Sequence, residues 1–360
     1  MQQHNLLVIN LGSTSTKYAV YCDETCVFEE TIRHPSEELG AFSDILSQRE
    51  YRETAILQGV EAHGFSLEKL TAIVARGGLT EPLPGGTFVV DEAMLAALCD
   101  ANAAKHASSL SGVIGYHIAQ KLHLPVYTVD PVVTDEMSEL AHYSGLKDIR
   151  RRSIFHALNQ KSVARHAAKQ LGKRYEDCRF IVVHMGGGIS VGAHENGKVI
   201  DNNNALDGDG PFSPDRTGGL PFGSVVDLCF SGKYTRKEVY DMFIKRGGLL
   251  SYIGTNDGRT AENMASAGDR DAAMALEAMA YQVSKEIGAQ STVLCGKIDA
   301  ILLTGGLAYS KLITGYITER VSFLAPVMLF PGENEMLALT EGALRALRGE
   351  ETPKRYSDIY

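Results

Sequence analysis

Short apolar runs, turn residues and amphipathic stretches follow one another in the same order twice along the chain. Residues 5–10, 15–22 and 25–33 form apolar runs separated by turn residues, which predicts three consecutive antiparallel strands. The pattern returns at 179–194 and 198–202. Helices are predicted near 36–61, 91–104, 109–123, 156–171 and 269–294, and further strands near 71–75, 126–130, 299–304 and 322–329.

The repetition predicts the fold class. Three antiparallel strands that open each half, followed by alternating helices and strands, describe a duplicated α/β unit. The strand predicted at 126–130 stops abruptly at Asp130-Pro131. We therefore expect a first domain of residues 1–130 plus 336–360 and a second domain of residues 131–335.

Each predicted hairpin carries a turn rich in glycine or hydroxyl residues. Glycine lets backbone N–H groups approach a phosphate closely, and hydroxyls and lysine add side-chain donors. The turns therefore predict two phosphate-binding segments, and a third glycine turn after the strand at 299–304 could close over the rest of a nucleotide. The expected nucleotide ligands are Asn10, Gly12, Ser13, Thr14, Ser15, Lys17, His184, Gly186, Gly187, Gly188, Gly305 and Gly306. Asp257 and Arg259 are expected around the adenosine, and the alternative is that Asp257-Gly258 is simply a turn.

Composition and charge narrow the function further. The chain has 360 residues, 44% of them hydrophobic, which is enough for a sizeable core in two domains. A formal net charge of −9 argues against nucleic acid as a partner. We expect no signal peptide and no membrane span. The six cysteines are scattered, which is typical of reduced thiols in a cytoplasmic protein.

One segment has the glycine and lysine spacing of a P-loop but lacks its last residue. In Gly192–Val199, Val199 stands where the magnesium-binding Ser or Thr would be. Asn196-Gly197 is better interpreted as a hairpin turn between two strands. A nucleotide would therefore be held by the glycine turns.

The order of these motifs resembles a known family. The residues that carry the resemblance are Asn10, Arg76-Gly77-Gly78, Asp130, Phe155-His156, His184-Met185-Gly186-Gly187-Gly188, Thr304-Gly305-Gly306 and Pro331-Gly332-Glu333-Asn334-Glu335. Across nearly the whole chain they resemble the acetate and butyrate kinases of the actin-like ATPase superfamily. The resemblance implies a duplicated actin-like (ribonuclease H-like) fold, with a nucleotide cleft between the two domains.

The resemblance also implies an activity. The family transfers the γ-phosphoryl group of ATP reversibly to a short-chain carboxylate, giving an acyl phosphate and ADP. The turn at 13–17 and the segment at 212–221 are closer to the butyrate kinases, so we expect butyrate as the substrate. Acetate, propionate or a branched acid is the alternative, since one methylene changes binding by only about 1–3 kcal/mol. We further expect a homo-oligomer, dimer or higher.

Four residues are candidates for the chemistry. A carboxylate is already a nucleophile at neutral pH, so cations and hydrogen-bond donors should dominate the site. Arg76, at a strand end before two glycines, suits a fork that holds the substrate carboxylate, although a surface arginine in a turn is the alternative. The resemblance places His156 at the reaction centre and suggests Arg216 as a second arginine. Asp130 could orient Arg76 or hold a magnesium-bound water, or simply cap a helix.

Magnesium is expected as the cofactor beside ATP. The resemblance implies that Glu335, with Glu333 nearby, is linked to the cation, and Asn10 is the third candidate. One or two carboxylates plus water is the usual arrangement for Mg²⁺, and solvated helix-start carboxylates are the alternative. Another class of function, an actin-like filament or a chaperone ATPase, would not need the anion-binding Arg76 and His156.

Overall fold

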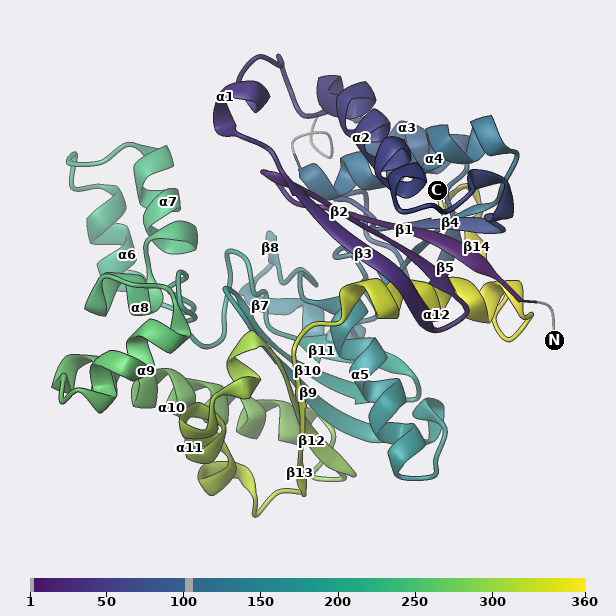
Figure 1. Ribbon diagram of the computed structural model, residues 1–360. Coiled ribbons are helices and arrows are strands. Elements are labelled where there is room, and N and C mark those ends of the chain that lie inside the picture. Colours follow the sequence, from purple (N-terminus) through teal and green to yellow (C-terminus); the bar gives the residue numbers. More distant parts are fainter. Residues whose placement is uncertain (1–2, 101–105) are drawn as a thin grey trace. The chain divides into compact units, whose positions relative to one another are not determined.

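The computed structural model describes residues 3–100 and 106–360 (Figure 1). Two compact units make up the chain. Unit 1 comprises Met1–Thr134 and Asn334–Tyr360, and unit 2 comprises Asp135–Glu333.

Unit 1 contains a mixed sheet. In order across the sheet, its strands are β14 (Lys354–Arg355), β5 (Thr87–Val89), β6 (Val126–Val129), β4 (Ala72–Ala75), β1 (Asn5–Leu11), β2 (Ser15–Cys22) and β3 (Thr25–Arg33). β1 pairs antiparallel with β2 and parallel with β4, and β4 is parallel to β6. The three strands predicted at the N-terminus are confirmed.

Unit 2 repeats this arrangement. Its strands, in order, are β11 (Lys198–Asn202), β10 (Ile189–Glu195), β9 (Arg179–Met185), β12 (Ala300–Gly305) and β13 (Val327–Pro331). β9 pairs antiparallel with β10 and parallel with β12, and β12 is parallel to β13. The order β3-β2-β1-β4-β6 thus equals β11-β10-β9-β12-β13, which confirms the predicted duplication. A separate small hairpin joins β7 (Tyr143–Leu146) to β8 (Ile149–Arg150).

Helices cover the sheets of both units. Unit 1 has α1 (Ser36–Leu39), α2 (Arg49–Ala62), α3 (Glu92–Leu98), α4 (Ala107–Leu122) and α12 (Glu335–Leu347). Unit 2 has α5 (Ala157–Gln170), α6 (Phe222–Cys229), α7 (Arg236–Lys245), α8 (Gly248–Ile253), α9 (Gly258–Ser266), α10 (Arg270–Val293) and α11 (Lys311–Val321). Among the described residues, no helix combines the length and the apolar character that crossing a bilayer would need.

The central strands are buried on both faces, which fixes where their last residues point. In β9, Ile181, Val183 and Met185 belong to the core beneath α10, whereas Phe180 and Val182 belong to the core with α5. Side chains alternate along a strand. The next even residue, His184, therefore faces α5. By the same alternation in β1, Asn10 lies on the face opposite to α4, where α12 packs.

Some predicted elements differ from the structure. The strand predicted at 322–329 begins only at Val327, because α11 and a turn occupy the preceding residues. The helix predicted over 36–61 is two helices, α1 and α2, separated by a nine-residue stretch that is not α-helical. α3 ends at Leu98, and residues 101–104 of the helix predicted at 91–104 lie outside the described residues. The short β5 and the helices between 222 and 253 were not anticipated.

The turn that imitates a P-loop is a hairpin turn, as predicted. Asn196 and Gly197 have φ angles of 53° and 75°, both in the left-handed region. Two such residues in succession form the turn that best matches the twist of paired strands. β10 and β11 pair on either side of it, from Glu195 with Lys198.

Candidate active site

In unit 1, three predicted site residues come together at the end of β1. Glu335 is the first residue of α12. Its Oε2 accepts a hydrogen bond from Asn10 Nδ2 at 2.8 Å and forms an ion pair with Arg76 Nη1 at 2.6 Å. Arg76 directly follows β4, where its backbone N–H donates to Ile9 O at 2.9 Å. Glu335 thereby holds both the arginine and the amide in fixed orientations.

One carboxylate oxygen of Glu335 is a candidate ligand for a hard cation. Its Oε2 takes both donors, and within the part of the chain that the structure describes its Oε1 has no hydrogen-bond partner. The side chain is 15% exposed, so Oε1 is not sealed off. A carboxylate oxygen beside the carbonyl oxygen of Asn10 is the donor chemistry that Mg²⁺ prefers. Among the described residues, no cluster of three or more His, Cys, Asp or Glu side chains forms a complete cation site.

Asp130 does not cap a helix. It ends the β6 segment with a left-handed φ of 37°, and no helix begins at Pro131. Its Oδ1 accepts from Gly86 N at 2.7 Å, and its own N–H donates to Gly86 O at 3.0 Å. The helix-cap alternative is therefore wrong, and the side chain is 1% exposed.

The first turn that was predicted to bind phosphate is at the surface. Ser13 and Thr14 are exposed between β1 and β2. Gly12 N donates to Ser15 O at 3.0 Å and closes the turn. Lys17, predicted as a phosphate ligand, instead forms a 2.8 Å ion pair with Glu29. Both of these side chains are more than a third exposed, so the pair contributes little to stability and leaves the lysine free to exchange partners.

In unit 2, His156 and His184 lie against each other. Their ring centroids are 3.8 Å apart and their planes differ by 12°. His156 precedes α5 and His184 lies in β9, on the face that α5 covers. The His156 Nδ1 atom lies 2.9 Å from Ser190 Oγ in the neighbouring strand β10.

A buried hydrogen-bond network determines which nitrogen of His156 carries the proton. Gln160 Nε2 donates to Ser190 O at 3.0 Å, and because a carbonyl only accepts, this contact fixes the amide orientation. The same Nε2 donates to Ser190 Oγ at 2.8 Å. The hydroxyl proton is then available for His156 Nδ1. The neutral imidazole therefore carries its proton on Nε2, which makes Nε2 a hydrogen-bond donor.

The network continues behind Gln160. Its Oε1 accepts from His194 Nε2 at 3.0 Å, and His194 Nδ1 in turn accepts from Tyr175 OH at 2.8 Å. Gln160 and His194 are both fully buried. These side chains leave the Gln160 amide no alternative orientation, so they support the tautomer of His156.

His184 is oriented by Asn159. Asn159 Nδ2 donates to Glu333 O at 2.8 Å, so its Oδ1 accepts from His184 Nδ1 at 2.7 Å. A neutral His184 then has an acceptor at Nε2, which lies 3.6 Å from Glu333 Oε1. Of the two predicted carboxylates, Glu333 lies beside His184 within unit 2, and Glu335 lies beside Asn10 within unit 1.

The second glycine turn packs against Arg216. A Cβ atom added to Gly188 would lie 2.3 Å from Arg216 Nη1, so a larger residue there would displace the Arg216 guanidinium. Ser213 Oγ donates to Gly187 O. The segment at 212–221 therefore reaches the turn that carries Gly186, Gly187 and Gly188, although sequence reasoning left the role of Arg216 open.

Arg216 and its neighbour Asp215 have unpaired polar atoms. Arg216 Nε and Asp215 Oδ1 are buried, have no hydrogen-bond partner, and lie 3.7 Å apart. Burial raises the pKa of Asp215, and the nearby Arg216 charge opposes that shift. Two orphaned polar atoms at this position fit a ligand or water that bridges them.

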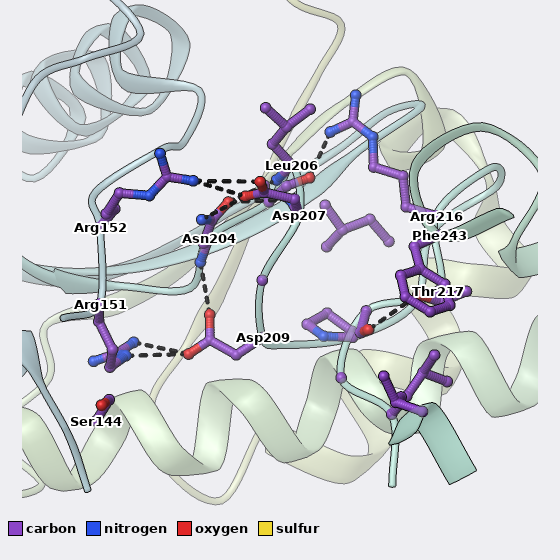
Figure 2. A pocket seen from close by; sticks show the side chains of 18 of the residues that line it. Ser144, Arg151, Arg152, Asn204, Leu206, Asp207, Asp209, Arg216, Thr217 and Phe243 are labelled. Atoms are coloured by element: carbon purple, nitrogen blue, oxygen red, sulfur yellow. Dashed lines mark hydrogen bonds and ion pairs between the residues drawn. The ribbon is translucent and has the colours of Figure 1, made fainter. Parts of the chain in front are cut away.

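A cavity of about 620 Å³ adjoins Arg216 in unit 2. Figure 2 shows Arg151 reaching Asp209 and Arg152 reaching Asp207, on one side of the loop that carries the two aspartates. Arg216 and Phe243 lie on the other side of that loop. The apolar wall of the cavity includes Leu206, Leu220, Phe222, Val225 and Phe243. No pattern along the chain indicates this cavity, because its lining comes from separate segments.

The predicted adenosine ligands lie beside one another. Asp257 caps α9, accepting from Thr260 N at 2.7 Å, and this backbone hydrogen bond lowers its pKa. A Cβ on Gly258 would lie 2.5 Å from Leu307 Cδ2, so the start of α9 packs against the turn at Gly305-Gly306. Asp257 and Arg259 are exposed.

The sequence did not indicate three residues that orient the histidines: Asn159, Gln160 and Ser190. Asn159 and Gln160 lie one helical turn after His156.

Comparisons with known proteins agree with this geometry. A sequence model described as the acetokinase family matches residues 140–325, more than half of the chain. The structure is similar to an acetate kinase from Porphyromonas gingivalis (18% identity, TM-score 0.77, covering 95% of this chain and 99% of that one). It is also similar to a propionate kinase from Francisella tularensis (21% identity, TM-score 0.73, covering 94% and 98%).

A more distant structure extends the likeness. A ROK family protein from Streptococcus pneumoniae in complex with sucrose aligns over 96% of this chain and 99% of that one, at 12% identity and a TM-score of 0.50. At these identities the likeness establishes the fold. Together with the duplicated sheets, it shows that the chain has the actin-like ATPase fold, as predicted.

Proposed function

The chain belongs to the acetokinase family, and from this premise we propose that it transfers the γ-phosphoryl group of ATP to butanoate. The reaction gives butanoyl phosphate and ADP and runs in both directions. The preference for a four-carbon acid rests on the turn at 13–17 and the segment at 212–221. In the structure, that segment packs against the glycine turn of unit 2.

The observation that carries the proposal is the fixed orientation of His156. Its neutral ring presents Nε2–H as a donor because Ser190 and Gln160 occupy the Nδ1 side. A carboxylate oxygen attacks the γ-phosphorus and the bond to the β–γ bridging oxygen breaks, so ADP leaves in one direct in-line step. His156 donates to an equatorial oxygen of the transferring group and stabilises its charge.

Other residues bind and orient the reactants. Arg76, held by Glu335, contacts the substrate carboxylate, and Arg216 supplies a second cation. The turns at 12–15 and 186–188 bind phosphates through their backbone N–H groups. Asp257, Arg259, Gly305 and Gly306 surround the adenosine. Glu335 and Asn10 would hold magnesium, which neutralises phosphate charge when bound.

Trapping the acyl phosphate with hydroxylamine tests the proposal. The protein is incubated with ATP, magnesium and acids from acetate to hexanoate, with isobutyrate included, and kcat/KM is compared. We expect butyrate to give the highest value, with neighbouring acids lower by about 10- to 200-fold. A maximum at acetate or propionate would show that the preferred acid is not butyrate, while the reaction class would stay as proposed. If ATP is hydrolysed but no acid yields hydroxamate, the proposed carboxylate kinase activity is wrong.

A further inference from the structure

Arg52 lies directly beneath the first phosphate-binding turn. It is on α2 and is 1% exposed. Its Nη1 donates to Gly12 O at 3.0 Å and to Ser15 O at 2.9 Å, and its Nη2 donates to Ser13 O at 2.8 Å. The guanidinium thus binds three carbonyl groups of one four-residue turn.

Within the described residues, Arg52 has no carboxylate partner within 4 Å. Its remaining acceptors are neutral: Gln48 Oε1 accepts from Nε at 3.0 Å and from Nη2 at 2.9 Å, and Thr16 Oγ1 accepts from Nη1 at 3.4 Å. The nearest acid on the helix, Glu53, pairs instead with Arg49 and Lys121. Burial lowers the pKa of Arg52, which reflects the cost of a charge removed from water.

The carbonyl contacts determine where the turn directs its N–H groups. In a trans peptide, the C=O and the following N–H point in opposite directions. Because Gly12 O and Ser13 O face Arg52, the N–H groups of Ser13 and Thr14 face away from it. Neither nitrogen has a protein acceptor in the described part of the chain, and both residues are exposed. Two consecutive outward N–H groups form an anion-binding nest.

We propose that Arg52 is a positioning residue and a buried counter-charge for a phosphate bound on this turn. It fixes the two peptides with their N–H groups outward, and its positive charge is neutralised only when an anion binds above. The inference rests on the proposed function for the identification of the anion as a nucleotide phosphate. The turn itself requires only a phosphate oxyanion.

Calorimetric titration of the full chain with ADP, inorganic pyrophosphate and adenosine tests this role. In Arg52→Gln, affinity for ADP and pyrophosphate should fall about tenfold or more, while affinity for adenosine stays unchanged. Arg49→Met is the matched control, since Arg49 lies on the same helix, is paired with Glu53 and should not affect any ligand. A merely structural role would lower the affinity for adenosine as well.

Gln48→Glu separates charge from folding. Gln48 is 7% exposed, and a glutamate there would place a carboxylate against the guanidinium while keeping its hydrogen bonds. The apo protein should melt at a higher temperature, and pyrophosphate should bind more weakly and with a shallower salt dependence. Pyrophosphate affinity equal to that of the wild type in Gln48→Glu would overturn the inference, whether or not Arg52→Gln folds.

The hydroxamate assay, run in parallel, distinguishes the two proposals. If the wild type forms hydroxamate but Gln48→Glu and Arg52→Gln bind pyrophosphate normally, this inference alone fails. If no acid yields hydroxamate but both variants lose pyrophosphate affinity, the proposed function fails and the buried counter-charge stands.

Discussion

The imidazole rings of His156 and His184 are stacked, with centroids 3.8 Å apart, and each is held by a different polar side chain. Ser190 contacts His156 Nδ1 at 2.9 Å, and Asn159 accepts from His184 Nδ1 at 2.7 Å. The Nδ1 atom thus has a polar contact in both rings, with Ser190 in His156 and with Asn159 in His184. Their neutral forms differ: Nε2 is a donor in His156 and an acceptor in His184.

The donor role of His156 predicts the order of its variants. His156→Gln keeps a hydrogen-bond donor and should retain more activity than His156→Ala, whose kcat should fall by about 10²–10³. Steady-state hydroxamate formation measures both. With chiral γ-phosphate, direct transfer inverts configuration at phosphorus. Retention would show a phospho-histidine intermediate and contradict this mechanism.

Ser190 should act on catalysis only through His156. Ser190→Ala removes the partner that sets the tautomer, so kcat should fall about tenfold while ADP affinity is unchanged. ¹⁵N NMR of the His156 ring should show a larger Nδ1–H population. Ser284→Ala is the control, because Ser284 is also buried but donates only to Ala280 O within α10. If the His156 tautomer is unchanged in Ser190→Ala, Ser190 does not position the His156 ring.

The sequence predicts the strands well where alternation is strong. β1, β2 and β3 lie within one residue of the prediction, because long apolar runs end at clear turn residues. β5 has only three residues, and Phe222 at the start of α6 and Phe230 just after its end are 88% and 86% exposed. Neither has the periodic burial from which a helix or strand is predicted.

The sequence indicates candidate site residues but not the contacts between them. Arg76 and Glu335 are 259 positions apart, so nothing local indicates that they pair. The His156–His184 stack depends on which face of β9 is covered by α5. The even-numbered Phe180 and Val182 could have indicated that face, because His184 continues their alternation. The sequence did not indicate that Arg52 is buried, because an arginine on a largely polar helix is usually a surface residue.

Arg76 should be needed for turnover and not for nucleotide binding. Arg76→Ala should lower kcat/KM for butyrate by about 10² or more, with ADP affinity retained, because the guanidinium is proposed to hold the carboxylate. Arg76→Lys should recover little, since lysine cannot form a bidentate contact. Hydroxamate kinetics and ADP titration measure the two effects. Near wild-type kcat/KM in Arg76→Ala would contradict the assignment.

Two adjacent glycines should respond differently to alanine. Gly305 has a φ of +86°, and an added Cβ would lie 2.4 Å from Met185 O, whereas Gly306 has open space around that position. Gly305→Ala should lower the free energy of unfolding by about 3 kcal/mol or more through strain and steric overlap. Gly306→Ala should change it little. Urea unfolding measures both, and equal values would contradict the close packing of β12 against β9.

Glu286 should make the protein less stable as the pH rises. Burial and the nearby Asp209 and Asp201 raise its pKa above the ordinary 4.5, while Gln290 and Arg151 oppose the shift.

Because the folded state then binds more protons than the unfolded state, the free energy of unfolding should fall as the pH rises from about 4.5 through the raised pKa. Glu286→Gln removes this titration, so the variant should be more stable than the wild type at neutral pH. The difference should vanish below pH 4.5, where the wild-type carboxyl is protonated in both states.

Glu319→Gln, at an exposed carboxylate on α11, is the control and should leave the pH profile unchanged. Urea unfolding from pH 4 to 8 measures the three profiles, and parallel profiles for wild type and Glu286→Gln would show that the buried carboxylate is not the source.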